Sequence, residues 1–229
     1  MAITSSRSLL VVGLLVLVAL VCPSEARKLS PEEKSLLRLV SSGVNEEEQC
    51  GPKLSIETPV CSVEKKDEGF ELRRYPAGEI WAETLVADTG YTSACAIGFY
   101  RCFYFISGQN SAEESIEMTA PVLIKPEPKA NGWKISFFTP SKFKSVDDVP
   151  VPDSPDVHIV STKEQLVAVS DTFGGFPTEA SYHNEWLKLK AALDKANLKY
   201  DESTVVYAGY SSPFEIFNRK QEVHVTIVE

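Results

Sequence analysis

The side chains between Ile97 and Ile106 are the part of the sequence best suited to hold a ligand. Aromatic and aliphatic residues follow one another there, with one cation, Arg101, among them. The spacing predicts a helix over residues 92–108 that is apolar around nearly its whole circumference, which packing one face on a sheet does not require. Its remaining surface is either buried between the sheet and an N-terminal extension, or it lines a cleft for a flat apolar ligand.

Residues that could carry out catalysis show no recognisable arrangement in the sequence. It has no G-x-S-x-G elbow for a serine nucleophile and no phosphate-binding glycine loop. It has no C-x-x-C pair, and its histidines (His158, His183 and His224) are scattered, so a structural zinc site has no support. Glu117 and Glu215 are the acid or base candidates of a minor hypothesis, a small-molecule enzyme. We therefore expect a protein that is not an enzyme.

Length and composition indicate a globular protein. The 229 residues are 43% hydrophobic, and 23 Lys and Arg against 32 Asp and Glu give a formal charge of −9. This charge repels nucleic acid at long range, and no run of Lys or Arg exceeds two residues. We expect no nucleic-acid partner.

Residues 1–26 have the pattern of a secretory signal peptide. Arg7 is followed by the apolar stretch Leu9–Val21 and then by the small residues Ser24 and Ala26, so we expect cleavage after Ala26. The apolar stretch is shorter than the roughly 20 residues that span a membrane, and we expect no stable membrane insertion. The predicted location is the secretory pathway, ending outside the cell (in a plant, the apoplast) or in the vacuole.

Residues 27–59 are interpreted as a helical extension and linker ahead of the main domain, residues 60–229. Ser30 and Pro31 have the types expected at the cap and first position of a helix. The acidic stretch 45–49, with Gly and Pro just after it, indicates a linker or loop.

Four cysteines follow the predicted signal peptide and enter an oxidising compartment. Cys50 and Cys61 flank a segment that contains Gly and Pro and can bend back, so we predict a disulfide between them, which would contribute roughly 3 kcal/mol. Cys95 and Cys102 lie on one face of the predicted helix but roughly 10 Å apart along it. That separation is beyond disulfide reach, and we expect both to be buried as small apolar residues.

An internal repeat organises the main domain. The first half predicts a strand, a helix and two strands at residues 79–88, 92–108, 116–124 and 133–138. The second half predicts the same order at residues 165–170, 178–196, 205–216 and 222–228. A Pro-containing signature occurs in the third element of each half, at Met118–Val122 and at Tyr210–Phe214.

The repeat predicts the fold class. With one long helix each, neither half is self-sufficient, so the two sheets must share a core. We predict an α+β fold in which two pseudo-symmetric strand-helix-strand-strand repeats form a distorted barrel-like sheet with two flanking helices. A strand at residues 70–75 precedes the first unit, and the proline-rich stretch 149–156 separates the halves.

Several short motifs resemble those of a known family. Residues 70–75 (FELRRY) are similar to a Y-E-V-R-x-Y strand, residues 116–122 (IEMTAPV) to I-x-M-T-x-P-V, and residues 219–224 (RKQEVH) to R-R-N-E-V-W. Residues 167–174 are similar to a strand that ends in F-x-G. In this order and spacing the chain resembles the SOUL heme-binding proteins, as a plant-type member with a signal peptide.

The resemblance implies two repeats in a distorted barrel and the non-catalytic binding of heme or another porphyrin, as a carrier or buffer, in an apolar surface cleft. A tetrapyrrole is a flat apolar plate with two carboxylates, so its site needs apolar walls and a cation at the rim. Iron-ligand candidates are His224, His183 and Met118. The proposed walls are Phe99, Phe103, Ile106, Met118 and Phe214, with Arg101 at the rim.

An interaction module is the alternative to a tetrapyrrole carrier. In that hypothesis the same apolar cleft takes a protein or lipid partner, and porphyrin binding is incidental. It predicts that Arg101→Glu abolishes capture of the partner and leaves weak, nonspecific porphyrin binding.

Overall fold

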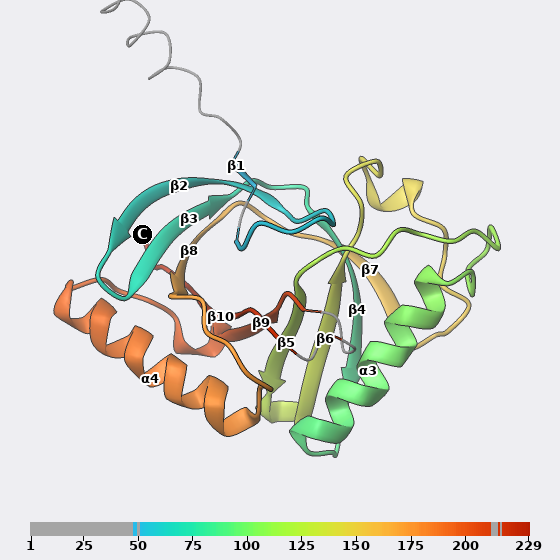
Figure 1. The fold of residues 1–229 in the computed structure, drawn as a ribbon. Coiled ribbons are helices and arrows are strands. Elements are labelled where there is room, and N and C mark those ends of the chain that lie inside the picture. The colour runs from blue at the N-terminus through green and yellow to red at the C-terminus, as the bar shows by residue number, and fades with distance from the viewer. Residues whose placement is uncertain (1–47, 50, 212–214, 216) are drawn as a thin grey trace, which may run out of the picture. The chain divides into compact units, whose positions relative to one another are not determined.

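The computed structural model describes residues 48–49, 51–211, 215 and 217–229. Two long helices lie beside one antiparallel sheet that is curled into a half-barrel (Figure 1). The helices are α3 (Tyr91–Ile106) and α4 (Glu179–Lys195). The strands are β1 (Glu48–Gln49), β2 (Val60–Asp67), β3 (Phe70–Tyr75), β4 (Ile80–Val86), β5 (Val122–Glu127), β6 (Gly132–Phe138), β7 (Val157–Ser161), β8 (Gln165–Ser170), β9 (Val206–Gly209) and β10 (Gln221–Thr226). The predicted α+β class is confirmed.

The strand order confirms the predicted repeat. In space the strands run β1-β2-β3-β8-β10-β9-β5-β6-β4-β7. One unit is therefore β4, α3, β5 and β6, the other is β8, α4, β9 and β10, and the two meet where Leu123 of β5 pairs with Ala208 of β9. The strand ahead of each unit crosses to the other one, since β3 pairs with β8 and β7 pairs with β4. Neither half completes its own sheet, as the sequence predicts.

Two predicted strands are shorter than expected. The stretch predicted as a strand over residues 116–124 enters the sheet only at Val122, because Pro121 has no N–H to donate to a ladder. The strand predicted over 205–216 ends at Gly209. The two Pro-containing signatures are consequently not equivalent: Met118 precedes β5, whereas Tyr210 follows β9. Residues 212–214 lie outside the described residues.

The start of the sheet also differs from the predicted domain boundary. Gln49 pairs with Val60 and Glu48 with Cys61, so β1 belongs to the sheet although its residues lie in the predicted linker. The predicted signal peptide and the helix at Ser30 lie outside the described residues. Within the described part of the chain, no helix is long and apolar enough to cross a membrane.

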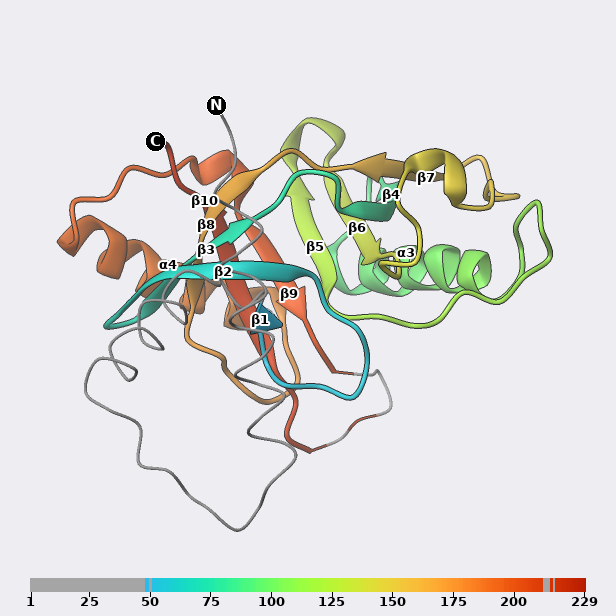
Figure 2. The same cartoon turned by 90° about the horizontal axis from the view of Figure 1, so that it is seen from above.

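The two faces of the sheet have different surroundings. Both helices pack on the same face, α3 against β4, β6 and β7, and α4 against β3, β8 and β10 (Figure 2). The main core lies between them and the sheet and includes Phe105, Ile135 and Leu193. Because side chains alternate along a strand, every second strand residue points to the opposite side, which we call the far face.

The contact between α3 and the sheet requires a glycine. A Cβ atom placed on Gly98 would lie 2.6 Å from Cδ1 of Ile135, closer than van der Waals contact allows. This close approach fixes the orientation of α3, so that the residues on its opposite side point away from the sheet.

Candidate functional site

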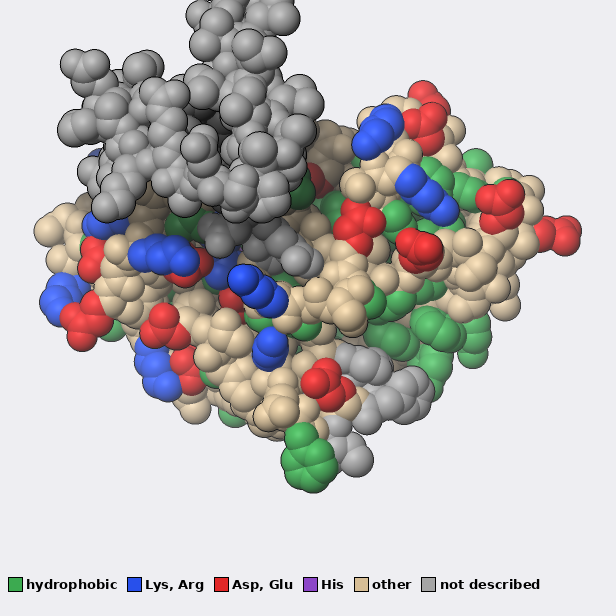
Figure 3. All heavy atoms as spheres, turned by 45° about the horizontal axis from the view of Figure 1, so that its top comes forward, with side chains coloured by type: hydrophobic (Ala, Val, Ile, Leu, Met, Phe, Trp, Pro, Cys, Tyr) green, Lys and Arg blue, Asp and Glu red, His purple; other side chains and the backbone are tan. Residues whose placement is uncertain are grey.

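The side of α3 that faces away from the sheet is aromatic. Tyr100, Phe103 and Tyr104 are 54%, 39% and 50% exposed, and Ile97 beside them is 42% exposed. Phe99, partly buried, lies at the edge of this surface. We call these five residues the α3 aromatic face. Figure 3 shows hydrophobic side chains gathered on the side of the molecule that carries α3.

The rings of the α3 aromatic face form two nearly parallel pairs. The Phe99 and Phe103 centroids are 5.7 Å apart with an interplanar angle of 13°, and those of Tyr100 and Tyr104 are 6.0 Å apart at 29°. Each pair is an i, i+4 pair, so the rings lie one above the other along the helix. The exposure of this face favours a cleft-lining surface over burial. Most of the N-terminal extension, which the buried interpretation requires, lies outside the described residues.

Arg101 lies at one edge of this face and already forms hydrogen bonds and an ion pair within the protein. Its Nη1 donates to the Leu85 carbonyl oxygen at 3.1 Å and to Thr84 Oγ1 at 3.3 Å, and its Nη2 lies 2.9 Å from Asp156 Oδ2. The guanidinium therefore ties α3 to β4 and to the segment before β7. A ligand anion at this rim would have to compete with Asp156.

The other predicted walls do not join this surface. Ile106 is buried in the main core, and Met118, in the segment before β5, is partly buried against the same core. Both are core residues because their neighbours are the inner sides of α3 and the sheet. Phe214 lies outside the described residues. Of the predicted walls, the structure brings Phe99 and Phe103 together.

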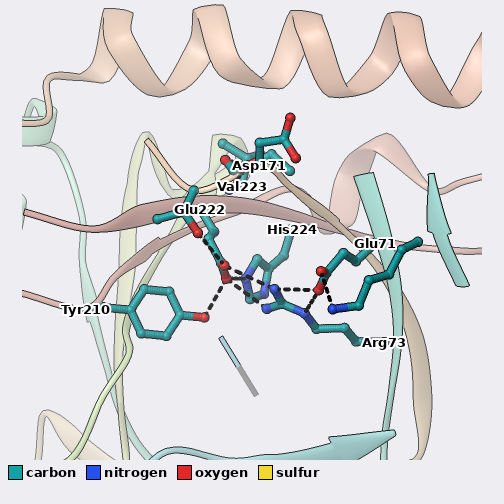
Figure 4. A network of polar contacts seen from close by, with 10 residues as sticks. Glu71, Arg73, Asp171, Tyr210, Glu222, Val223 and His224 are labelled. Atoms are coloured by element: carbon teal, nitrogen blue, oxygen red, sulfur yellow. Dashed lines mark hydrogen bonds and ion pairs between the residues drawn. The ribbon is translucent and has the colours of Figure 1, made fainter. Parts of the chain in front are cut away.

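His224 lies on the far face, in a buried polar network (Figure 4). Nη1 and Nη2 of Arg73 on β3 donate to Oε2 and Oε1 of Glu222 on β10, at 2.9 and 3.1 Å. Tyr210 Oη donates to Glu222 Oε2 at 2.7 Å, and His224 Nε2 lies 3.2 Å from the same oxygen. Figure 4 shows these side chains on the side of the strands away from a helix.

Burial and charge set the protonation of this network. Burial raises the pKa of Glu222, but hydrogen bonds from His224 and Arg73 outweigh it and lower the pKa to about 2. Burial lowers the pKa of His224, and the nearby Glu222 offsets part of that effect. Glu222 is thus an ion paired with Arg73. The carboxylate helps to stabilise the fold above its ordinary pKa, and this contribution is lost as the pH falls toward 2.

The structure separates His224 from the α3 aromatic face. His224, an iron-ligand candidate from the sequence, is 9% exposed and points into the far-face network. The cavity beside it, lined in part by Tyr75, Trp81 and Val167, holds about 70 Å³. That volume is well below the roughly 300 Å³ of the smallest usual ligand pockets. His183 is an exposed residue of α4. Neither histidine lies on the α3 aromatic face.

Among the described cysteines, one is in a disulfide bond and two are free thiols. Cys61 is disulfide-bonded, and the predicted partner, Cys50, lies outside the described residues. Cys95 and Cys102 are free, partly buried and buried respectively, and burial raises the thiol pKa to about 11 and 12. They are packing residues, as predicted. Among the described residues, no cluster of His, Cys, Asp and Glu could hold a metal ion.

Sequence reasoning missed Arg73, Glu222 and Tyr210 as a unit. Arg73 is 5% exposed and Glu222 1%. The sequence does contain a signal for this pair. Arg73 and Glu222 each lie within a strand whose other residues are mostly buried, and a buried charge is almost always paired with an opposite one.

The fold and the exposed side of α3 define a class: a two-repeat α+β protein with an aromatic surface on the helix of its first repeat. Residues 56–226 match the sequence model of the family described as SOUL heme-binding protein. The chain belongs to this family, as its motifs predict.

Individual relatives agree with the family assignment. Human heme-binding protein 2 is 33% identical over 159 residues, which cover 67% of this chain and 76% of the human protein. Mouse heme-binding protein 2 is 31% identical over 166 residues, covering 70% of this chain and 79% of its own. The EcmrR C-terminal domain has a similar fold, with a TM-score of 0.53 and 9% identity over 70% of this chain and 97% of that domain.

Proposed function

We propose that this chain binds heme or a related tetrapyrrole without converting it, as a carrier or buffer, at the α3 aromatic face. Two lines support the proposal. Relatives in the family are named for heme binding, and α3 presents an exposed surface of paired aromatic rings. The single observation that carries the site is the exposure of Tyr100, Phe103 and Tyr104 on one helix side without a charge among them.

The energetics fit a ligand that covers this face. A tetrapyrrole that hides on the order of 300 Å² of apolar surface gains roughly 7–8 kcal/mol at about 25 cal/mol per Å². Part of this gain is offset by the translational and rotational freedom lost on association. Aromatic stacking and the exchange of Asp156 for a ligand carboxylate at Arg101 then decide whether binding reaches the submicromolar range, beyond about −8 kcal/mol.

The proposed site of action is the secretory pathway. The support is the signal-peptide pattern of residues 1–26 and the disulfide bond of Cys61, since disulfides persist in oxidising compartments. Fractionation of cells that express the full chain with a C-terminal tag tests this location. Tag recovered in the cytosol, at the size of the uncleaved chain, would contradict it.

The binding experiment compares the two helices of the same protein. Phe103→Glu places a carboxylate in the α3 aromatic face, and Leu187→Glu places one on the exposed side of α4, where Leu187 is 48% exposed. Titrations with hemin and with metal-free protoporphyrin are followed by Soret absorbance and tryptophan quenching. We expect Phe103→Glu to weaken both by more than tenfold and Leu187→Glu to leave both unchanged.

Two other results would contradict the proposal. Equal weakening by both variants would mean that porphyrin binds nonspecifically to the anionic protein. If the unmodified chain shows no saturable binding of either compound, the tetrapyrrole function is wrong, and the α3 aromatic face remains as a surface for a protein or lipid partner.

A further inference from the structure

Both long helices begin at the same end of the sheet (Figure 1), and their first turns line one cleft. The cleft holds about 730 Å³, a volume within the size range of ligand sites. Its lining comes from residues 90–93 of α3, from residues 178–180 and His183 of α4, and from Tyr207 of β9. None of the five residues of the α3 aromatic face lines it, so the cleft is separate from the surface proposed for the tetrapyrrole.

The first turn of α3 presents backbone N–H groups that have no acceptor. The first hydrogen bond of the helix runs from the Ala94 N–H to the Gly90 carbonyl oxygen at 3.0 Å, so the N–H groups of residues 91–93 have no partner within the helix. No other described residue accepts from them, and Gly90 has no side chain that could. The exposed hydroxyls of Thr92 and Ser93 line the cleft beside them. This end of α3 therefore combines several donors with the positive end of the helix dipole.

The first turn of α4 is already satisfied within the protein. Its cap residue, Thr178, accepts from the Ser181 N–H, and Glu179 places a carboxylate in the first turn, where it offsets the helix dipole. Among the residues that line the cleft, Glu179 is the only Asp, Glu, Lys or Arg, and it forms no ion pair with a described residue. The cleft thus has donors on its α3 side and one free carboxylate on its α4 side.

Tyr207 places a further donor at the base of the cleft. Its backbone pairs with strands on both sides and the residue is 5% exposed, so only the outer end of its side chain can reach the cleft. Its ring is stacked on that of Tyr182, with 4.5 Å between centroids. The Tyr207 hydroxyl forms no hydrogen bond with a described residue and keeps accessible surface. Because buried tyrosines usually find a partner for this group, the free hydroxyl indicates an acceptor bound in the cleft.

Glu179 and the Tyr207 hydroxyl interact electrostatically without a hydrogen bond between them. Burial raises the pKa of Tyr207, and the charge of Glu179 raises it further. The hydroxyl is therefore protonated at neutral pH and acts as a donor. A ligand held between the α3 side and Glu179 must accept hydrogen bonds on one side and donate one on the other. Hydrogen phosphate meets both requirements because it keeps a proton at neutral pH, whereas sulfate keeps none.

We propose that this cleft binds hydrogen phosphate. The oxygens of the ion accept from the first-turn N–H groups of α3 and from the hydroxyls of Thr92, Ser93 and Tyr207, since helix N-termini are suited to bind phosphate. The O–H of the ion donates to Glu179. A carboxylate at this place repels an oxyanion that carries no proton and so selects phosphate over sulfate. The cleft is wide enough to admit the ion together with part of its hydration shell.

Inorganic phosphate and sulfate are the probes that test the site. Each is titrated into the isotope-labelled full chain at one pH and equal ionic strength, so that screening and the charge of His183 are the same in both series. The chemical shifts of the Thr92 and Ser93 backbone amides report binding at the α3 end. We expect saturable binding of phosphate, and binding of sulfate at least about tenfold weaker because it cannot donate to Glu179.

Two tyrosine substitutions form a matched pair. Tyr207→Phe removes the free hydroxyl, and we expect phosphate to bind about tenfold more weakly, because a hydrogen bond to a charged group is lost. Tyr182→Phe removes the hydroxyl of the stacked partner ring. That hydroxyl donates to the Ala208 carbonyl oxygen at 3.5 Å, and Tyr182 does not line the cleft, so we expect unchanged affinity. Thermal melts establish that both variants are folded.

Two further substitutions test the two sides of the cleft. Glu179→Gln removes the repelling charge, so the affinities for sulfate and phosphate should come within about threefold of each other. Gly90→Ser supplies a hydroxyl that accepts from the first-turn N–H groups of α3 and competes with the ion, and phosphate affinity should fall by about threefold or more. A Cβ atom at Gly90 meets no neighbouring atom, so this variant fits the fold.

The proposal is overturned if phosphate does not bind saturably to the unmodified chain. It is also overturned if sulfate binds to that chain as tightly as phosphate does, or if Tyr207→Phe retains full affinity for phosphate.

Discussion

The helices α3 and α4 occupy equivalent places in the two repeats but differ on the side that faces away from the sheet. Between Tyr91 and Ile106, Arg101 is the only charged residue, and the outward side carries exposed rings. Between Glu179 and Lys195 the outward side is charged, with Lys188 paired to Glu185 at 2.7 Å. Both helices bury one stripe of large residues in the same core.

The N-terminal ends of the two helices also differ, because α4 has a side-chain cap and α3 has none. Thr178 Oγ1 caps α4 by accepting from the Ser181 N–H, and Ser181 Oγ in turn accepts from the Thr178 N–H, which forms a capping box. Gly90 precedes α3 and has no side chain to cap it, and α3 has no acidic residue in its first turn. The helix α4 is thus stabilised locally, whereas α3 depends on the sheet beneath it. The outward side of α3 carries the exposed rings at which we propose that a tetrapyrrole binds.

The largest effects are expected on the buried sides, where the helices are alike. Phe105 of α3 is 1% exposed and Leu193 of α4 is fully buried. We expect Phe105→Ala to lower the free energy of unfolding by about 3–5 kcal/mol and Leu193→Ala by about 2–5 kcal/mol, because each leaves a cavity. Urea denaturation measures both. If one of the two substitutions lowered the free energy of unfolding by less than about 1 kcal/mol, the buried sides of the two helices would not be equivalent.

Effects of intermediate size are expected at the helix starts. Thr178→Ala removes a capping hydroxyl and should cost about 1 kcal/mol. Gly90→Ser is the matched change on α3. A Cβ atom there meets no neighbouring atom, and the new hydroxyl should add a few tenths of a kcal/mol. Urea denaturation of the two variants compares the ends directly, and a large gain from Gly90→Ser would mean that α3 frays in the native state.

The smallest effect on stability is expected on the α3 aromatic face. Tyr104→Lys replaces a half-exposed ring on the outward side, and we expect the free energy of unfolding to change by no more than about 0.5 kcal/mol. Hemin titration of the same variant should show a loss of affinity. Strong destabilisation would show that the rings support the fold rather than a ligand.

Helix positions and the repeat could be predicted from the sequence because they depend on local periodicity. Strands β2 and β7 were not predicted, since each lies outside the strand-helix-strand-strand pattern and has few buried side chains. In β2, Cys61 is the one buried position, and β7 buries Val157. Their pairing depends on partners far along the chain, which local patterns do not report.

The candidate site was predictable to a similar extent. The aromatic residues of α3 follow one another closely in the sequence, so Phe99 and Phe103 could be identified as candidate walls from composition alone. Met118 and Ile106 are equally apolar, and only packing separates a wall from a core residue. The pairing of Arg73 with Glu222 joins residues 149 positions apart, and it exists because β8 lies between β3 and β10 in the sheet.

The crossing of β3 and β7 between the repeats has a consequence for biosynthesis. When β6 leaves the ribosome, β4 still lacks β7 and β5 still lacks β9, so the first repeat has two unpaired edges. β3 also lacks its partner β8, which is made after β7 and before β9. Open edges are templates for pairing with other chains. The nascent chain therefore passes through an aggregation-prone interval that ends only after the last strand, β10, joins β8 to β9.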